Sequence, residues 1–565
     1  MIWWVNQPGR ALAEKADIAS LAERVSWLKI LKWDPSDFPN LALDFEIEVA
    51  ARRIPLTLIY PDLFPDFPAR VVAKSKERLS SHQYGAKGEL CLEWRADNWR
   101  PDITGSMLIE SAYRLLSNED EDEEVESAHD LTVGQEVRAR TVRFLLSPDC
   151  KSSLLGLPEG SQIPIKTSER YFAKTWVTEV TQIGEDESVL WKAEPATSFG
   201  NATRQGFVFR RPVPQNFESK EGVQALLGEK LDEWKLTHVG ESLTMVFASG
   251  DHVTLFELLS SNDALLEYPT IEVPSDETRL PDEYVALQGK CVGIVGCGSV
   301  GSKIAGTLAR SGVGKFVLVD SDVFLPGNVI RNELDLRASG VNKTKAVERR
   351  ILELNPRAAV DISEILLGRQ ESGAWSAATA LKLSNCDLIV DATADINAFI
   401  TCAAVAQAYK KPLVWGRVYE GGLGGLVARV RPDIEPPPQA ARRQIDGWFQ
   451  QKGIPWVSSE ETRTYTANDG IRAIVATDAE VGLVAMHMVR YATDALLDPS
   501  SAQFPQAAYA IGFSKKWIFS QPFEVWPIEL VLEGSWGAPA EENKDAKVKE
   551  LIEEFFPDAG EKRAG

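Results

Sequence analysis

The stretch Cys291-Val292-Gly293-Ile294-Val295-Gly296-Cys297-Gly298-Ser299-Val300-Gly301 decides the fold of the C-terminal part of this 565-residue chain. Its first five residues form a short apolar run with the length and composition of a buried parallel strand. A glycine-rich turn follows, and residues 302–310 have the apolar spacing of a helix. A strand, a glycine turn and a helix in this order place the helix N-terminus where it can bind a phosphate group.

A second apolar run, residues 315–319, ends in Asp320, where an acidic side chain can accept hydrogen bonds from a ribose hydroxyl. Together with Gly296, Gly298 and Gly301, this aspartate predicts a nucleotide-binding βαβ unit. Taken alone, the pattern is most typical of dinucleotide-dependent oxidoreductases. Only a minority of the proteins that contain it are adenylating enzymes.

The polar residues after Asp320 favour ATP chemistry over hydride transfer. Asn328, Arg331 and Lys343 follow in short order, and Asp395 comes just after another buried apolar run. Attack of a carboxylate on the α-phosphate of ATP needs cations around the triphosphate and an acidic residue for Mg²⁺. Arg331 and Lys343 can supply the cations, and Asp395 can supply the Mg²⁺ ligand. Taken alone, Arg331 or Lys343 is more often a solvated surface charge, and Asp391, at the end of that apolar run, is more often a helix cap.

Residues from about 285 to 535 resemble the ThiF-type adenylating domain of ubiquitin-activating and sulfur-carrier-activating enzymes. The family pattern of Asp, then Asn and Arg, then Gly-x-x-Lys is matched by Asp320, Asn328-Val329-Ile330-Arg331 and Gly340-Val341-Asn342-Lys343. The catalytic aspartate of the family corresponds to Asp395. Lys345 competes with Lys343 for the lysine position, but Lys343 keeps the spacing from the glycine.

The resemblance implies a Rossmann-like domain with a mainly parallel sheet that uses ATP and Mg²⁺ to adenylate the C-terminus of a protein, with release of pyrophosphate. The implied ATP-binding residues are Gly296, Gly298, Gly301, Asp320, Asn328, Arg331, Lys343 and Asp395. Arg331, Lys343 and Asp395 are the implied catalytic residues among them, with Mg²⁺ held by Asp395.

The N-terminal region predicts an α+β domain with a candidate nucleophile, Cys91. Apolar residues at helical spacing between Arg10 and Leu31 predict an amphipathic helix, and residues 43–49 and 54–60 have the character of strands. The proline-rich segment 61–68 follows, and then His82, Gly88-Glu89-Leu90-Cys91-Leu92, Trp99-Arg100-Pro101 and a helix beginning near Thr104. This order resembles a ubiquitin-conjugating domain, which implies that Cys91 forms a thioester.

The ubiquitin-conjugating pattern is incomplete around this cysteine, and a lone cysteine is usually a small buried hydrophobe. In the family's His-Pro-Asn motif the asparagine helps to stabilise the oxyanion, whereas this chain has His82-Gln83-Tyr84. Tyr84, Asn98 or a backbone amide could supply the missing donor. His82 is expected to be structural rather than a base.

Two features depart from the adenylating family. Many relatives hold a structural zinc with paired Cys-x-x-Cys motifs, which the six cysteines here do not form, so we expect no zinc. Ubiquitin-activating relatives also carry a catalytic cysteine in a crossover segment, and here no cysteine follows Cys402. That segment offers hydroxyls, among them those of Thr464 and Thr466. Three explanations stay open: direct transfer to Cys91, an ester on one of these threonines, or a replaced cysteine, expected at Ala467.

Length and composition indicate a multidomain cytoplasmic protein with no membrane segment and no signal peptide. The expected parts are a ubiquitin-conjugating-like domain at 1–118, an acidic linker at 119–134, a mixed α/β linker domain at 135–280, the adenylating domain at 281–538 and a charged tail at 539–565. Within the tail, residues 543–556 predict a short helix. Scattered cysteines fit a reducing compartment, and a net charge of −21 argues against general nucleic-acid binding. In the linker domain, residues 206–209 predict a short strand and residues 222–234 predict a helix. This domain shows no catalytic constellation and is expected to be a spacer.

Over the whole chain, the order of parts resembles the fused conjugating-activating ligases of bacterial CBASS anti-phage operons, the CD-NTase-associated ligases. The resemblance implies a homodimer that joins the C-terminus of a cGAS-like nucleotidyltransferase to a target amine. A tethered thiol also has a raised effective concentration near an easily hydrolysed adenylate. Two alternatives stay open: activation of a ubiquitin-like or sulfur-carrier protein, and a nucleotide-binding scaffold with an inactive conjugating domain. An NAD-dependent oxidoreductase ranks last.

Overall fold

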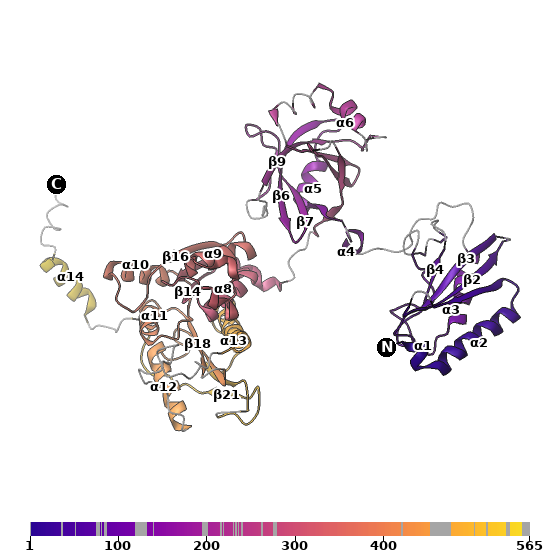
Figure 1. Ribbon diagram of the computed structural model, residues 1–565. Helices are drawn as coiled ribbons and strands as arrows, with labels where there is room; N and C mark the ends of the chain where they lie inside the picture. Colours follow the sequence, from indigo (N-terminus) through magenta and orange to yellow (C-terminus); the bar gives the residue numbers. More distant parts are fainter. Residues whose placement is uncertain are drawn as a thin grey trace. The chain divides into compact units, whose positions relative to one another are not determined.

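The protein forms two compact units, Met1–Arg140 and Thr141–Gly565, in the computed structural model shown in Figure 1. The structure describes residues 2–35, 38–50, 52–74, 79–80, 82–83, 88–118, 133–138, 140–194, 202–214, 217, 220–229, 231, 234, 237–238, 241–261, 264–274, 280–419, 422–452, 476–501, 503–515, 518–537 and 543–555. Within these ranges, no helix has both the length and the apolar composition needed to cross a bilayer.

The first unit is an antiparallel four-stranded sheet with helices packed against it. Its elements are α1 (Trp3–Asn6), α2 (Pro8–Arg24), β1 (Leu28–Asp34), β2 (Leu41–Val49), β3 (Arg52–Tyr60), β4 (Arg70–Ala73), α3 (Gly105–Ser117) and α4 (Val133–Glu136). The strands pair in the order β1-β2-β3-β4. The helix predicted over residues 10–31 ends earlier, at Arg24, because the chain becomes extended at Val25 and Leu28 already begins β1.

A buried carboxylate fixes the helices of this unit to the sheet. Glu14 on α2 accepts hydrogen bonds from the Tyr60 hydroxyl at 2.8 Å and from the Gly105 amide at 2.7 Å. Arg10, one turn earlier, donates to the same carboxylate at 2.9 Å. Because buried charge is tolerated only when it is paired and hydrogen-bonded, this arrangement fixes the start of α3 relative to α2 and β3.

The second unit begins with a mixed sheet of nine strands. Its elements are β5 (Val142–Leu146), α5 (Pro148–Leu155), β6 (Gln162–Phe172), β7 (Thr175–Ile183), β8 (Trp191–Lys192), β9 (Ala202–Phe209), α6 (Lys220–Leu227), β10 (Leu243–Ser249), β11 (His252–Leu258), β12 (Leu265–Tyr268) and β13 (Thr270–Glu272). The strand predicted at 206–209 lies within β9. The helix predicted around 222–234 is α6, which begins at Lys220 and ends at Leu227.

A third sheet, of eight strands, occupies the C-terminal part of the chain in the order β16-β15-β14-β17-β18-β19-β20-β21. Its strands are β14 (Cys291–Val295), β15 (Lys315–Val319), β16 (Ala359–Ser363), β17 (Leu388–Asp391), β18 (Leu413–Tyr419), β19 (Gly424–Val430), β20 (Ala508–Gly512) and β21 (Val525–Ile528). The pairs from β16 through β18 are parallel, and those from β18 to β21 are antiparallel. The expected parallel core is therefore observed, with an antiparallel extension on one side.

Helices cover both faces of this sheet. They are α8 (Ser299–Arg310), α9 (Lys343–Leu354), α10 (Gly373–Ser384), α11 (Ile396–Ala408), α12 (Pro438–Gln451) and α13 (Asp478–Leu497), with the 3₁₀ helices η2 (Asp282–Gly289), η3 (Pro326–Arg331) and η4 (Leu336–Ala338). Side chains of α8, α9 and α13 share one apolar core, and those of α10, α11 and α12 share another. This double cover explains why the central strands are apolar on both faces.

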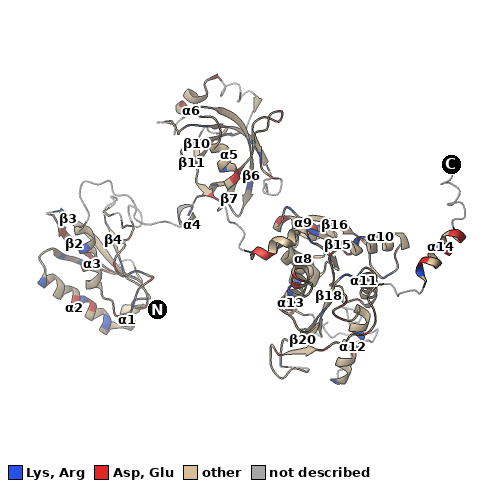
Figure 2. Ribbon diagram, turned by 180° about the vertical axis from the view of Figure 1, so that it is seen from behind, with Lys and Arg blue, Asp and Glu red and all other residues tan. Residues whose placement is uncertain are grey.

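The helix predicted in the charged tail is α14 (Lys544–Phe555). Figure 2 shows acidic and basic residues together along α14 and along α2. None of the side chains of α14 is buried, although those of Val548, Leu551, Ile552 and Phe555 are apolar. The tail helix therefore contributes no residue to the described core.

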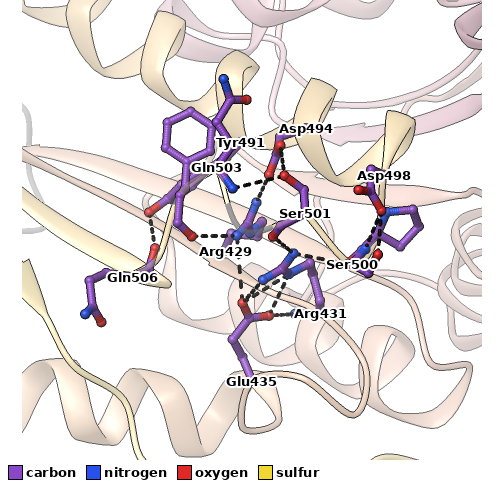
Figure 3. Close-up of polar contacts among 12 residues, drawn as sticks. Arg429, Arg431, Glu435, Tyr491, Asp494, Asp498, Ser500, Ser501, Gln503 and Gln506 are labelled. Carbon is purple, nitrogen blue, oxygen red and sulfur yellow. Dashed lines mark hydrogen bonds and ion pairs between the residues drawn. The ribbon is translucent and has the colours of Figure 1, made fainter. Parts of the chain in front are cut away.

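A buried ionic network fastens the antiparallel side of the third sheet to α13 (Figure 3). Arg429 is 0% exposed, and its Nη1 donates to Asp494 Oδ2 at 2.5 Å. Arg431 pairs with Glu435 at 2.6 Å and donates to the Ser501 carbonyl at 2.7 Å. Because each buried cation has a carboxylate partner, the network is a structural clamp between β19, α13 and the segment that follows α13.

Candidate nucleotide site and candidate thiol

The predicted phosphate loop lies between β14 and α8. Gly296 has φ +90°, a conformation that side chains bearing a Cβ rarely adopt, and a Cβ at Gly301 would lie 1.8 Å from the Gly296 carbonyl oxygen. Gly298 is the N-cap of α8, and a Cβ there would meet no heavy atom within 4 Å. The space in front of Gly298 is therefore open, so that an anion can reach the first-turn N–H groups of α8.

Asp320 lies at the carboxyl end of β15 and holds the phosphate loop. Its Oδ2 accepts the Cys297 N–H at 2.7 Å, and its Oδ1 accepts the Asp322 N–H at 2.8 Å. Each carboxylate oxygen can accept a further hydrogen bond, so the predicted contact with a ribose hydroxyl is sterically and chemically compatible with these contacts.

The segment containing Asp395 meets the phosphate loop directly. A Cβ at Gly296 would lie 3.0 Å from Thr393 Cγ2 and 3.1 Å from the Ala392 carbonyl carbon. Thr393 and Ala392 follow β17, which is parallel to β14, so both loops leave the same edge of the sheet. The structure thus brings the glycine loop and the acidic loop together, as expected for ligand binding at the carboxyl ends of parallel strands.

Asp395 is the N-cap of α11 and is held in place by several donors. Its Oδ1 accepts the Asn397 and Ala398 N–H groups at 2.7 and 3.2 Å, and Arg369 donates to its Oδ2. Partial burial favours a higher pKa, but the hydrogen bonds from Arg369 and from the backbone outweigh it and lower the pKa of Asp395. The carboxylate is therefore ionised at neutral pH, as a Mg²⁺ ligand must be.

The residues around Asp395 are positioned by unusual backbone and by a buried acid. Ala394 has φ +55°, a strained conformation for alanine of the kind that gathers at functional sites. Asp391 is buried and accepts hydrogen bonds from the Thr393 N–H at 3.0 Å and the Thr393 hydroxyl at 2.6 Å. The Thr393 oxygen in turn accepts the Asp395 N–H at 3.0 Å, which links the two aspartates.

Arg369, which we did not predict, lies after β16. Gly368 has φ +78°, and a Cβ there would come within 2.5 Å of the Asn397 backbone, so the chain passes very close to the start of α11. This close approach delivers the Arg369 guanidinium to Asp395. No local signal marked it, since 26 residues separate the pair in the sequence.

Lys343 and Asp322 form a second ion pair near the phosphate loop. The Lys343 ammonium lies 2.7 Å from Asp322 Oδ2, and its side chain is 13% exposed. Lys345, the competing residue, instead pairs with Glu364 and is 50% exposed. Because Asp322 also donates its N–H to Asp320, Lys343 belongs to the cluster around the phosphate loop.

Asn328 and Arg331 both lie on η3. The Asn328 Oδ1 accepts the Leu325 N–H at 2.8 Å, so this side chain stabilises the turn at the start of η3. Arg331 is the last residue of η3 and is half-buried. The predicted roles of Asn328 and Arg331 toward ATP stay predictions.

A small charged cavity borders the Asp395 loop. It has a volume of about 30 Å³ and is lined by Asp391, Ala394, Trp415, Gly416, Arg417, Leu426, Arg442, Ile445 and Asp446. Burial raises the pKa of Asp391 and of Asp446 and lowers that of Arg442. Asp446 Oδ1 is buried without a hydrogen-bond partner among the described residues. Sequence patterns gave no sign of this cavity, because its walls come from β17, β18, β19 and α12.

The candidate thiol of Cys91 lies in the first unit and is 9% exposed. Its N–H donates to the His82 carbonyl at 2.7 Å, and Arg95 Nη1 donates to its Sγ at 3.5 Å. His82 is an exposed residue, and its expected structural role stays a prediction. Arg95 was not among the residues that we predicted.

The candidate crossover acceptors Thr464, Thr466 and Ala467 lie outside the described residues, so their roles stay open. Cys297 and Cys402 are fully buried, and burial raises the pKa of both thiols well above its usual value. Neither cysteine is therefore suited to accept an acyl group.

Comparison with known proteins agrees with the predicted adenylating domain. Residues 280–437 match the ThiF family, which confirms the expected resemblance over that segment. The uncharacterized protein y4oA of Sinorhizobium fredii is 32% identical over 167 residues, covering 27% of this chain and 28% of that protein. The ATP-dependent ubiquitin transferase-like protein Cap2 of Pseudomonas aeruginosa is 28% identical over 136 residues, covering 22% of this chain and 23% of that protein.

The chain is also similar to a ubiquitin-like modifier-activating enzyme and to a protein of known structure. Ubiquitin-like modifier-activating enzyme 5 of Caenorhabditis briggsae is 23% identical over 160 residues, which cover 26% of this chain and 36% of that protein. The structure of E. coli MccB with ATP is 15% identical and covers 46% of this chain and 67% of its own, with a TM-score of 0.33. The three curated relatives are thus matched over only 23% to 36% of their own lengths.

Proposed function

We propose that this protein is an ATP-dependent ligase that adenylates the C-terminus of a partner protein, carries the acyl group as a thioester on Cys91 and transfers it to an amine. The observation that carries the proposal is the meeting of the phosphate loop with the Asp395 loop at one sheet edge, in a segment that matches the ThiF family. The whole-chain activity is inferred, since the curated relatives are matched over a minor part of their length.

The described residues fit ATP and Mg²⁺. Substitution of Gly301 would fill the turn of the loop, whereas the space in front of Gly298 is open for a phosphate. We assign the loop amides and Lys343 to the phosphates and Asp320 to the ribose. We assign Asp395 to Mg²⁺, which when bound would neutralise phosphate charge during attack of the donor carboxylate. Asn328 and Arg331 are assigned to the nucleotide by the family pattern.

The proposed partner is a protein with a free C-terminus, and we favour a cGAS-like nucleotidyltransferase. Similarity to Cap2 and the order of the parts support this choice. A ubiquitin-like protein is the alternative donor, supported by similarity to ubiquitin-like modifier-activating enzyme 5. We further propose that the adenylating segment, 281–538, forms the homodimer. Segment 1–118 then provides the conjugating domain.

Pyrophosphate exchange and intact mass test the proposal together. Full-length protein with Mg-ATP and a cGAS-like nucleotidyltransferase should exchange pyrophosphate and gain a thiol-labile adduct on Cys91. Asp395→Ala should lower exchange by about 100-fold or more, because it removes charge stabilisation at the reacting phosphate. Asp361→Ala is the matched control, since Asp361 makes a surface ion pair with Lys382.

The adenylating site and the Cys91 thiol can be tested separately. Cys91→Ala should leave exchange within about twofold of the wild type and should abolish the thiol-labile adduct. A thiol-resistant, hydroxylamine-sensitive adduct would instead support an ester on Thr464 or Thr466. If neither a cGAS-like nucleotidyltransferase nor a ubiquitin-like protein supports pyrophosphate exchange, the ligase proposal fails. A nucleotide-binding scaffold then becomes the better explanation.

A further inference from the structure

Arg95 is the charged side chain that contacts the candidate thiol. Its Nη1 lies 3.5 Å from Cys91 Sγ, within hydrogen-bonding distance for sulfur. The Arg95 side chain is 44% exposed, so it lies at the surface rather than in the core. An arginine in this position stays protonated at any pH at which the protein is folded, and it offers several directed N–H donors.

A closed turn holds Arg95 in this position. The Arg95 N–H donates to Asn98 Oδ1 at 2.6 Å, and Asn98 Nδ2 donates to the Glu93 carbonyl at 2.7 Å. The Glu93 N–H meets the Ser111 hydroxyl on α3 at 3.0 Å, which ties the turn to the helix. Asp97 lies 3.3 Å from Arg95 Nε and orients the guanidinium. The cation is thus placed by its own loop before any acyl group arrives.

The amide side chains near Cys91 are already used for structure. Asn98, which we considered as an oxyanion donor, uses both ends of its amide to close the turn. Gln83 accepts the Leu79 N–H at 2.8 Å and donates to the Gly88 carbonyl at 3.3 Å. These contacts hold both amide groups in place within the structure, whereas Arg95 points an N–H group at the sulfur.

We propose that Arg95 is a catalytic residue that stabilises the oxyanion formed on the acyl group carried by Cys91. This inference rests on the proposed thioester function. The thiolate attacks the carbonyl carbon of the acyl adenylate, an S–C bond forms, and the carbonyl π electrons move to oxygen. Collapse of this oxyanion breaks the C–O bond to the phosphate and releases AMP. Attack by an amine then forms the C–N bond, expels the thiolate and loses one proton to solvent.

The chemical part of the inference can be tested without the natural donor. Phenyl thioacetate is the probe: transfer of its acetyl group to Cys91 passes through the same kind of oxyanion and releases thiophenolate. Alkylation of Cys91 by iodoacetamide needs the thiolate but forms no oxyanion. Both rates are measured on the full chain by peptide mass analysis of Cys91.

Arg95→Gln should slow acetyl transfer about 10- to 100-fold, which is at or below the usual effect of losing one oxyanion donor because the site is half-exposed. Alkylation should slow by less. Arg95→Lys keeps the charge and should recover part of the acetyl-transfer rate. Arg100→Gln is the matched control, because Arg100 is a nearby arginine in the sequence that also pairs with an aspartate, Asp102, and its side chain is 68% exposed.

The following outcomes would overturn the inference. Acetyl transfer within twofold of the wild type in Arg95→Gln removes Arg95 from the reaction. An equal fall in both rates removes its role toward the oxyanion, and an equal fall in Arg100→Gln shows a general charge effect. Failure of wild-type Cys91 to accept acetyl also refutes the inference.

The same variants separate this inference from the proposed function. If wild-type protein forms no ATP-driven adduct but acetyl transfer depends on Arg95, the ligase proposal fails and the role of Arg95 stands. If Arg95→Gln forms the ATP-driven thioester as fast as the wild type, the role of Arg95 fails and the ligase proposal stands.

Discussion

Gly301→Ala should disrupt the phosphate loop, because the loop has no room for a methyl group at this position. The new Cβ would lie 1.8 Å from the Gly296 carbonyl oxygen and 2.9 Å from its carbon. To move from 1.8 Å to the 3.4 Å at which ordinary contact begins, the loop backbone must retreat by about 1.6 Å. Overpacking of this kind costs about 2–3 kcal/mol.

The same strain sets the expected loss of nucleotide affinity. If the variant relaxes by opening the loop, nucleotide binding must restore the strained geometry, and about 2–3 kcal/mol corresponds to a roughly 30- to 150-fold weaker Kd. If the loop does not relax, the strain destabilises the folded state. The midpoint of the thermal unfolding transition that ATP shifts should then fall by about 4–12 °C. Titration calorimetry with Mg-ATP and differential scanning calorimetry on the full chain measure the two effects.

Gly298→Ala is the matched control, three residues earlier in the same loop. Its Cβ would meet no heavy atom within 4 Å, and its φ of −77° suits alanine, so the thermal transition should not move. Its nucleotide affinity should still fall if phosphates approach the N-cap of α8. The reasoning is refuted if Gly301→Ala binds Mg-ATP within threefold of the wild type and melts within 1 °C of it.

Two further predictions concern groups away from the reacting atoms. Asp494→Ala should lower the free energy of unfolding, measured by urea denaturation, by about 3–5 kcal/mol, because it leaves the buried Arg429 charge without its closest carboxylate. The double variant Arg429→Met with Asp494→Leu should recover much of that loss. The oxidant diamide should form a disulfide between Cys291 and Cys386, whose Sγ atoms lie 3.6 Å apart, and the mass should fall by two hydrogen atoms. Cys291→Ser should abolish that change, and an unchanged mass in the wild type would contradict the prediction.

The parallel core and its loops could be predicted because their signals are local. Gly296 and Gly301 lie at positions of the turn where a Cβ is strained or would clash, and the apolar run before them has the length of a buried strand. Asp320 and Asp395 each follow such a run, so the parallel topology alone places both at the same edge.

The missed residues have no local signal. Arg369 reaches Asp395 because Gly368 lets the chain pass against the start of α11, and Arg442 reaches Asp391 from a helix about 50 residues later. The antiparallel extension of the sheet was missed for a related reason. β19 and β20 are separated by α12 and α13, so their pairing depends on tertiary contact and not on spacing.

The pairing of charges near the phosphate loop bears on how a nucleotide could bind there. Lys343 is paired with Asp322, and Arg369 is paired with Asp395, so each of these cations has a carboxylate that competes with phosphate. A free triphosphate would have to draw the cations away from these carboxylates and would face the uncompensated acids. Mg²⁺ held by Asp395 would supply positive charge there and would offset the loss of Arg369 from that carboxylate. Under the proposed function, nucleotide affinity should therefore rise with Mg²⁺, and Arg369 would then be available to the phosphates.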